Sequence, residues 1–222
     1  IVATGIETYY NTYGTDQWWV LEEGLYFNGP NSTFDYSIQY KYTNYTYNQA
    51  GIRDSKTSNG VTTTYYLDGT RVLYETDGTN EIYYTYDVDG SLLSMIYNNV
   101  EYYYVFNVFG DVIYLVDSSG SIVVEYTYDA YGNIVFQTNS TLSKANPYRY
   151  RGYRYDEDTN LYYLQSRYYN PETGRFINAD GMLKASNTVL GHNMFAYTEN
   201  NPVMNVDPTG YAVCLASSPS TF

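Results

Sequence analysis

Aromatic and polar residues alternate along most of this 222-residue chain, and the alternation recurs at a regular interval. The unit is an aromatic residue, any residue, a second aromatic residue and then Asp or Asn, with Gly three residues further on. Four copies occupy residues 45–51, 84–90, 104–110 and 126–132, and a weaker copy occupies 65–69. The second aromatic residues fall at 47, 66, 86, 106 and 128, so the period is about twenty residues.

Each unit predicts a strand that ends in a hairpin turn. Residues two apart in a strand share a face, so Tyr126 and Tyr128 are expected to stack on the same side of the sheet. The Asp or Asn that follows favours a turn by hydrogen-bonding its own backbone. Glycine is the residue that most readily adopts the left-handed conformation with which such a turn closes.

A second set of turn signals lies between these units. Asn98 and Asn99 separate two apolar runs as a two-residue hairpin turn would, and residues 117–120 form another turn. From residue 81 to 138, turns therefore come about every ten residues. The pattern predicts an all-β fold, an antiparallel meander with two strands per repeat, in which stacked hairpins bury aromatic faces that one hairpin cannot bury alone.

Composition supports strands and excludes several functions. The chain holds 33 Tyr, and tyrosine suits a half-buried sheet because its ring packs while its hydroxyl reaches water or a partner. The net charge of −13 makes nucleic acid a poor partner. A single histidine, His192, and a single cysteine, Cys214, argue against a multi-histidine metal site, a Ser-His-Asp triad and an intrachain disulfide. We expect no cofactor and no metal.

The chain divides by composition into four parts. Residues 1–40 are an irregular β lead-in, 41–138 carry the hairpin repeats, 148–211 form a distinct C-terminal segment, and 212–222 are a tail. Residues 139–147 are a polar connector. There is no long apolar run and no signal-peptide pattern, so we expect no membrane span and interpret the chain as a piece of a longer protein.

The C-terminal segment is the most distinctive part. Two long strands are expected on either side of a turn at 156–160, and residues 170–174 form a second turn with proline and glycine. Three strings, at 168–176, 193–203 and 207–210, follow in order. These strings resemble the RHS-repeat-associated core domain, which ends the YD-repeat array of bacterial RHS proteins and related toxins, and the repeats at 45–132 add to the resemblance.

The resemblance implies an architecture and a role. Hairpins of this family spiral into a hollow shell with the core segment as an irregular cap, and a chain of this size is expected to form a partial shell. The shell encloses or displays a variable C-terminal toxin, so the implied partners are the rest of the same shell and that toxin. The implied location is secreted or on the cell surface.

The resemblance also implies self-cleavage. In some members two aspartates cut the chain after an Asp-Pro-x-Gly-hydrophobic motif, and the matching positions here are Asp180 and Asp207, with the cut after Tyr211. Two carboxylates that share a proton can activate water against a nearby peptide bond. The sequence departs from the pattern at Gly181, where proline is common, at Tyr211, where leucine is common, and in a slightly long interval between the aspartates.

Each candidate residue also has a purely structural interpretation. Asp180 and Asp207 can be turn residues, and Arg175, which can orient a carboxylate, can equally pair with strand-end carbonyls. His192 is interpreted as a loop residue, and Cys214 lacks an evident base. The acidic turns at 87–89 and 156–158 do not complete a calcium loop, so solvated turns are favoured.

Three functional hypotheses remain. The first is a structural shell segment whose enzymatic activity is at most self-cleavage. The second is an aromatic-repeat module that binds cell-wall polymer or carbohydrate through tyrosine rings; the two adjacent tryptophans at 18–19 lie outside the repeat, which disfavours it. The third is an aspartic peptidase that acts on other proteins, and the absence of Asp-Thr-Gly or Asp-Ser-Gly loops argues against it.

Overall fold

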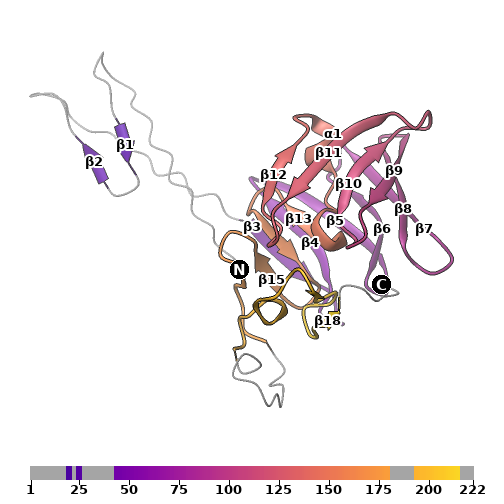
Figure 1. The fold of residues 1–222 in the computed structure, drawn as a ribbon. Helices are drawn as coiled ribbons and strands as arrows, with labels where there is room; N and C mark the ends of the chain where they lie inside the picture. Colours follow the sequence, from indigo (N-terminus) through magenta and orange to yellow (C-terminus); the bar gives the residue numbers. More distant parts are fainter. Residues whose placement is uncertain (1–18, 22–23, 27–42, 181–192, 216–222) are drawn as a thin grey trace, which may run out of the picture.

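One long antiparallel sheet forms most of the molecule (Figure 1). The computed structural model describes residues 19–21, 24–26, 43–180 and 193–215. The ten strands of this sheet lie side by side in chain order, so every connection is a hairpin, as the repeat predicts. They are β3 (Thr43–Tyr47), β4 (Arg53–Ser58), β5 (Val61–Asp68), β6 (Arg71–Thr76), β7 (Glu81–Tyr86), β8 (Leu92–Tyr97), β9 (Val100–Phe106), β10 (Val112–Val116), β11 (Ile122–Tyr128) and β12 (Ile134–Gln137).

The predicted repeat turns have the expected chemistry. After β7, Asp87 accepts hydrogen bonds at its side chain from the N–H groups of Asp89 and Ser91, at 2.9 and 2.8 Å. Gly90 then adopts φ +84° and donates to the Asp87 carbonyl at 3.0 Å. The other set of turns uses left-handed asparagines, with Asn98 at φ +48° and Asn99 at φ +67°. Positive φ at both central residues gives the backbone twist that a two-residue hairpin requires.

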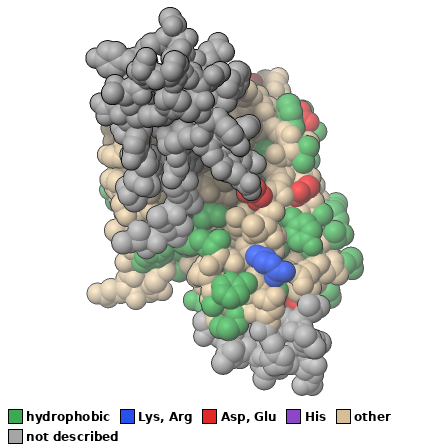
Figure 2. Space-filling model, turned by 90° about the vertical axis from the view of Figure 1, so that its left-hand side faces the viewer, with side chains coloured by type: hydrophobic (Ala, Val, Ile, Leu, Met, Phe, Trp, Pro, Cys, Tyr) green, Lys and Arg blue, Asp and Glu red, His purple; other side chains and the backbone are tan. Residues whose placement is uncertain are grey.

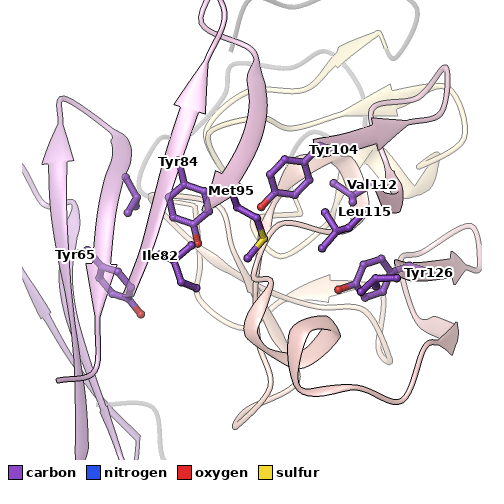
Figure 3. Close-up of a cluster of buried hydrophobic side chains, with 10 residues drawn as sticks. Tyr65, Ile82, Tyr84, Met95, Tyr104, Val112, Leu115 and Tyr126 are labelled. Carbon is purple, nitrogen blue, oxygen red and sulfur yellow. The ribbon is translucent and has the colours of Figure 1, made fainter. Parts of the chain in front are cut away.

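The inward face of this sheet carries a continuous aromatic and aliphatic core. Met95 is fully buried and lies between Tyr84 and Tyr104 (Figure 3). Tyr126 and Tyr128 stack with ring planes 17° apart, as predicted from their spacing. The buried hydroxyls are satisfied, because Tyr84 donates to Glu75 and Tyr104 donates to Asn146, both at 2.9 Å. Tyrosine therefore supplies apolar area without leaving unpaired polar atoms.

The C-terminal segment packs against the concave side of the curved sheet (Figure 1). Its elements are the 3-10 turn Tyr150–Gly152, β13 (Arg154–Asp156), β14 (Leu161–Tyr163), β15 (Tyr168–Asn170), β16 (Arg175–Phe176), a second 3-10 turn at Thr198–Asn200 and β17 (Asn205–Val206). The connector before it contains α1 (Thr141–Ala145), and the tail after it contains β18 (Cys214–Leu215). β13–β16 form a four-stranded antiparallel sheet, and β17 pairs with β18. The long open sheet and the irregular segment inside it agree with the expected partial shell and cap.

The structure differs from the sequence-based expectation at two places, one in this segment and one in the connector before it. The two long strands expected around residues 156–160 are three-residue strands, because left-handed backbone at Arg151 and Gln165, with φ +53° and +61°, interrupts the chain on either side. The polar connector contains the helix α1, which is short but begins with a full capping box between Ser140 and Ser143.

Buried ion pairs tie this segment to the sheet. Arg53 of β4 contacts Asp156 at 2.5 Å, and both side chains are at most 4% exposed. Arg154 likewise pairs with Glu75 of β6. The expected solvated turn at 156–158 is therefore wrong for Asp156. Burial opposes ionisation of its carboxyl, but Arg53 and Lys56 outweigh that effect and lower its pKa.

The remaining described elements are peripheral. β1 (Trp19–Leu21) pairs with β2 (Gly24–Tyr26) in the region expected to be an irregular lead-in; most of that region and residues 216–222 of the expected tail lie outside the described residues. On the face shown in Figure 2, hydrophobic side chains form separate groups among uncharged surface, and charged groups are few. Apolar side chains scattered in this way are ordinary for a folded surface.

Candidate functional site

Two buried carboxylates share one arginine at the C-terminal end of the described chain. Asp180 is 7% exposed, Asp207 is 0% exposed, and Arg167 lies between them. Its Nη2 atom is 2.9 Å from Oδ2 of Asp207 and 3.4 Å from Oδ2 of Asp180. The fold thus brings together the two aspartates that the family resemblance implies as the catalytic pair, although they lie far apart along the chain.

The backbone at both aspartates is fixed by neighbouring segments. Asp180 lies beyond the end of β16, and its N–H donates to the Met194 carbonyl at 3.0 Å. Asp207 directly follows β17, and its N–H donates to the hydroxyl of Tyr153 at 3.1 Å. That hydroxyl is also 3.2 Å from the hydroxyl of Tyr197, and burial raises the pKa of Tyr153. Tyr153 therefore stays a neutral hydrogen-bonding partner that sets the position of Asp207.

All three nitrogens of the Arg167 guanidinium donate hydrogen bonds. Nε donates to the Gly210 carbonyl at 2.5 Å, and Nη1 donates to the Met194 carbonyl at 3.1 Å. The guanidinium also lies 3.6 Å from the ring centre of Phe176, which covers one of its faces. A planar fork with several fixed partners has little freedom, so Arg167 orients both carboxylates.

The peptide bond between Tyr211 and Ala212 lies directly at Asp207. The N–H of Ala212 donates to Oδ1 of Asp207 at 3.0 Å. On the other side of Tyr211, the Gly210 carbonyl accepts from Arg167. Tyr211 and Ala212 are exposed while the Asp207 carboxylate is buried, so solvent reaches the bond from outside and Asp207 contacts it from inside.

The paired carboxylates of the site suit acid–base chemistry. Both contact the same guanidinium, that of Arg167. One carboxylic acid beside one carboxylate can both give and take a proton, which peptide hydrolysis requires.

Arg167 is the site residue that sequence reasoning missed. The predicted orienting residue, Arg175, lies in β16 with an exposed side chain, and the guanidinium in contact with both aspartates belongs to Arg167. The available signal was an isolated charge: Arg167 precedes Tyr168 and Tyr169 in a stretch where charged residues are otherwise absent. His192 and Gly181 lie outside the described residues, and Cys214 is exposed in β18.

The other candidate sites give weaker support for a function. Within the described part of the chain, no three His, Cys, Asp or Glu side chains are grouped to hold a metal ion, and no helix is long and apolar enough to cross a membrane. On the outward face of the sheet, Tyr66, Tyr74 and Tyr83 form a ladder with ring centres 5.1 and 4.4 Å apart. These rings face one another, which favours cross-strand packing over stacking on a sugar.

Comparison with known proteins identifies similar chains. A family model described as Teneurin YD-shell matches residues 69–203. The chain is 47% identical over 178 residues to the tRNA3(Ser)-specific nuclease WapA of Bacillus spizizenii, an alignment that covers 78% of this chain and 8% of that protein. It is 39% identical over 71 residues to the toxin protein Tse5 of Pseudomonas aeruginosa, covering 32% of this chain and 5% of that protein.

Solved structures show the same fold. The crystal structure of TcdB2-TccC3 without its hypervariable C-terminal region matches with a TM-score of 0.59 at 22% identity, covering 92% of this chain and 10% of that chain. At this identity the match establishes the fold alone. The chain spans less than a tenth of the length of WapA, so it corresponds to one section of that protein.

Proposed function

The chain belongs to the teneurin YD-shell family, as an RHS/YD-repeat shell domain, and from this premise we propose that it closes one end of a shell around a C-terminal effector and cuts itself after Tyr211. The observation that carries the proposal is the hydrogen bond of 3.0 Å from the Ala212 N–H to a carboxylate oxygen of Asp207. It connects the nitrogen that would leave to a group that can protonate it.

The proposed reaction is hydrolysis by the aspartate pair. A water molecule adds to the Tyr211 carbonyl carbon while one carboxylate, assigned to Asp180, takes its proton. The nitrogen of Ala212 gains a lone pair as that carbon becomes tetrahedral. Asp207, which carries the single proton of the pair at the start of this reaction, gives that proton to the nitrogen as the C–N bond breaks. The products are a carboxylate at Tyr211 and an amine at Ala212, and the pair ends with the same number of protons as it began.

The enclosing role rests on shape and on the relatives. The sheet curves around the C-terminal segment and remains open at β3 and β12, as expected for a section of a larger wall (Figure 1). Similar proteins are described as a nuclease and a toxin, and a structural neighbour has a hypervariable C-terminal region. We extend the proposal to partners and location: the rest of the same shell and its toxin, in a secreted or surface-exposed protein.

Intact mass of the purified 222-residue chain tests the catalytic part. We expect fragments 1–211 and 212–222 from the parent, and an uncut chain from Asp180→Asn and from Asp207→Asn. The control is Asp87→Asn, because equivalent repeat turns at Asn48 and Asn107 already use asparagine. This control should be cut like the parent.

Circular dichroism in the near ultraviolet shows whether the parent and each variant are folded. A parent chain that folds and stays whole overturns self-cleavage. Cutting after Tyr211 that persists in folded Asp207→Asn removes the aspartate from the mechanism.

A further inference from the structure

A cavity of about 600 Å³ lies between the concave side of the sheet and the C-terminal segment. The sheet lines it with residues of β5 and β6 and of the turns that follow β7 and β9, and the C-terminal segment lines it with residues in 148–154 and 163–165. Neither Asp180 nor Asp207 is among the described residues of its wall, so the cavity is separate from the aspartate pair. Small-molecule sites occupy roughly 300–1,000 Å³, so a cavity of this size can hold a ligand.

The charged groups on the cavity wall are all positive. The described residues of the wall include no Asp, Glu or Lys, and the arginines among them are Arg53, Arg71, Arg151 and Arg154. Three of these arginines pair with acids that do not line the cavity, namely Asp156, Asp111 and Glu75. In a chain with a net charge of −13, this wall favours an anionic ligand.

Arg154 has one buried donor without an acceptor in the described part of the chain. The residue is 8% exposed, and its Nη2 atom pairs with Glu75. Its Nη1 atom is buried and has no hydrogen-bond partner. The ring centres of Tyr65, Tyr84 and Tyr148 lie 4.9, 5.9 and 5.1 Å from the guanidinium carbon. Ring faces attract the cation but do not replace a hydrogen-bond acceptor, so an oxygen of a ligand would stabilise this group.

Two of the other arginines are already bound by the protein. Arg53 donates through Nη1 and Nη2 to Asp156, at 2.5 and 3.4 Å. Arg151 donates through Nη1 and Nη2 to the carbonyls of Phe109 and Pro202, at 2.9 and 2.6 Å. A single guanidinium can bind a carboxylate, whereas a phosphate or a sugar has more polar oxygens to satisfy. The wall therefore fits one carboxylate better than a phosphate or a sugar.

Much of the remaining wall is apolar. Val72 is buried in the core of the sheet, and Leu67 and Leu92 pack against that core. The hydroxyl of Tyr86, another residue of the wall, is satisfied within the protein, because it donates to the Val72 carbonyl at 2.8 Å. An aliphatic or aromatic group suits such surroundings.

We infer that this cavity is a binding site for an apolar monocarboxylate. The carboxylate accepts a hydrogen bond from Nη1 of Arg154, and the aliphatic or aromatic body packs against Leu67, Val72 and Leu92. A small organic acid and the C-terminus of a peptide share this chemistry. The site does not depend on self-cleavage.

Calorimetric titration of the purified 222-residue chain with 3-phenylpropionate tests the inference. The matched probe is 3-phenylpropanamide, which has the same body without the charge. We expect the acid to bind at least about ten-fold more tightly than the amide, the effect of one hydrogen bond to a charged group. The peptide N-acetyl-glycyl-glycyl-phenylalanine, compared with its C-terminal amide, distinguishes the two sources, because the acid that binds more tightly identifies the source that the cavity favours.

Two leucine substitutions show whether the probe occupies the cavity, and both leave the Arg154–Glu75 pair intact. Leu92 lines the cavity, whereas Leu93, the next residue of β8, is 50% exposed and is not part of the wall. Leu92→Phe narrows the cavity and should weaken binding of 3-phenylpropionate at least about ten-fold. Leu93→Phe is the control and should change it less than about two-fold, as expected for a surface substitution.

Near-ultraviolet circular dichroism shows whether both variants are folded. Equal binding of the acids and their amides, or no binding of either acid, would overturn the inference. Unchanged binding by folded Leu92→Phe would place the probe elsewhere and overturn it too. Inorganic phosphate that binds as tightly as 3-phenylpropionate would contradict it as well, since the apolar body would then play no part.

Discussion

Gly210 illustrates how one residue can control the chemistry of the site. Its φ of +74° and its contacts with Ser166 and Leu164 leave no space for a methyl group. We predict that Gly210→Ala displaces the Tyr211–Ala212 bond from Asp207 and slows cleavage at least ten-fold, since small misplacements of reacting groups are costly.

Gly120→Ala is the matched control for this substitution. Gly120 adopts φ +82° in an exposed repeat turn, and no atom lies within 4 Å of its notional Cβ. Both variants carry the same kind of backbone strain, so only the contact with residues 164–167 differs. Equal cleavage rates in the two variants, measured by intact mass, would mean that close packing at Gly210 is irrelevant.

The site residues differ in how far sequence could identify them. Asp180 and Asp207 were found because they match positions in a known family pattern. Arg167 was not, because its role depends on contacts with segments 13 and 40 residues away, which no local pattern records. Arg175 looked equivalent in sequence, but strand alternation in β16 turns its side chain outward and buries Phe176 instead.

At the level of elements, the turns were predictable because their chemistry is local. The points at which tertiary packing cuts a strand short were not. Asp87 and Asn98 determine their turns through hydrogen bonds and backbone preferences within a few residues, so the sheet could be read directly. The short strands β13 and β14 are bounded by left-handed residues, Arg151 and Gln165, whose types do not favour that conformation. Packing of the segment against the sheet imposes it.

The ion pair that joins β13 to the sheet gives a prediction for stability. Asp156→Asn would leave Arg53 buried without a counter-charge, so we expect a loss of about 3–5 kcal/mol in the free energy of unfolding. Asp158→Asn breaks the Lys56–Asp158 pair, whose side chains are 16% and 30% exposed, and should cost less than about 1 kcal/mol.

Urea unfolding measures both changes. The two variants should differ in the midpoint with little change in the slope, because the surface exposed on unfolding is the same. Similar midpoints would show that the Arg53–Asp156 contact does not tie the C-terminal segment to the sheet.

For the molecule as a whole, buried tyrosine predicts unfolding in alkali. Burial raises the pKa of Tyr84, Tyr104 and Tyr162 well above the ordinary value of about 10. The unfolded chain loses these protons first, so this part of the stability is fully present below pH ~10 and is lost as the pH rises above that value. Unfolding of the protein and ionisation of these phenols should therefore occur over the same pH range.

Parallel titrations check this coupling. Phenolate absorbance from the buried tyrosines should appear in the same pH interval in which the near-ultraviolet circular dichroism disappears. Ionisation of all tyrosines while the dichroism persists would contradict the buried positions assigned to these rings.

The most direct test of self-cleavage mixes two chains in one sample. One is the unlabelled parent, and the other is Asp207→Asn labelled with nitrogen-15 so that its mass is distinct. The account predicts that the parent is converted to fragments 1–211 and 212–222 while the labelled chain stays whole, because each aspartate pair reaches only its own chain. An uncut parent would contradict the account, and so would cutting of the labelled chain, which would make the protein a peptidase that acts on other molecules.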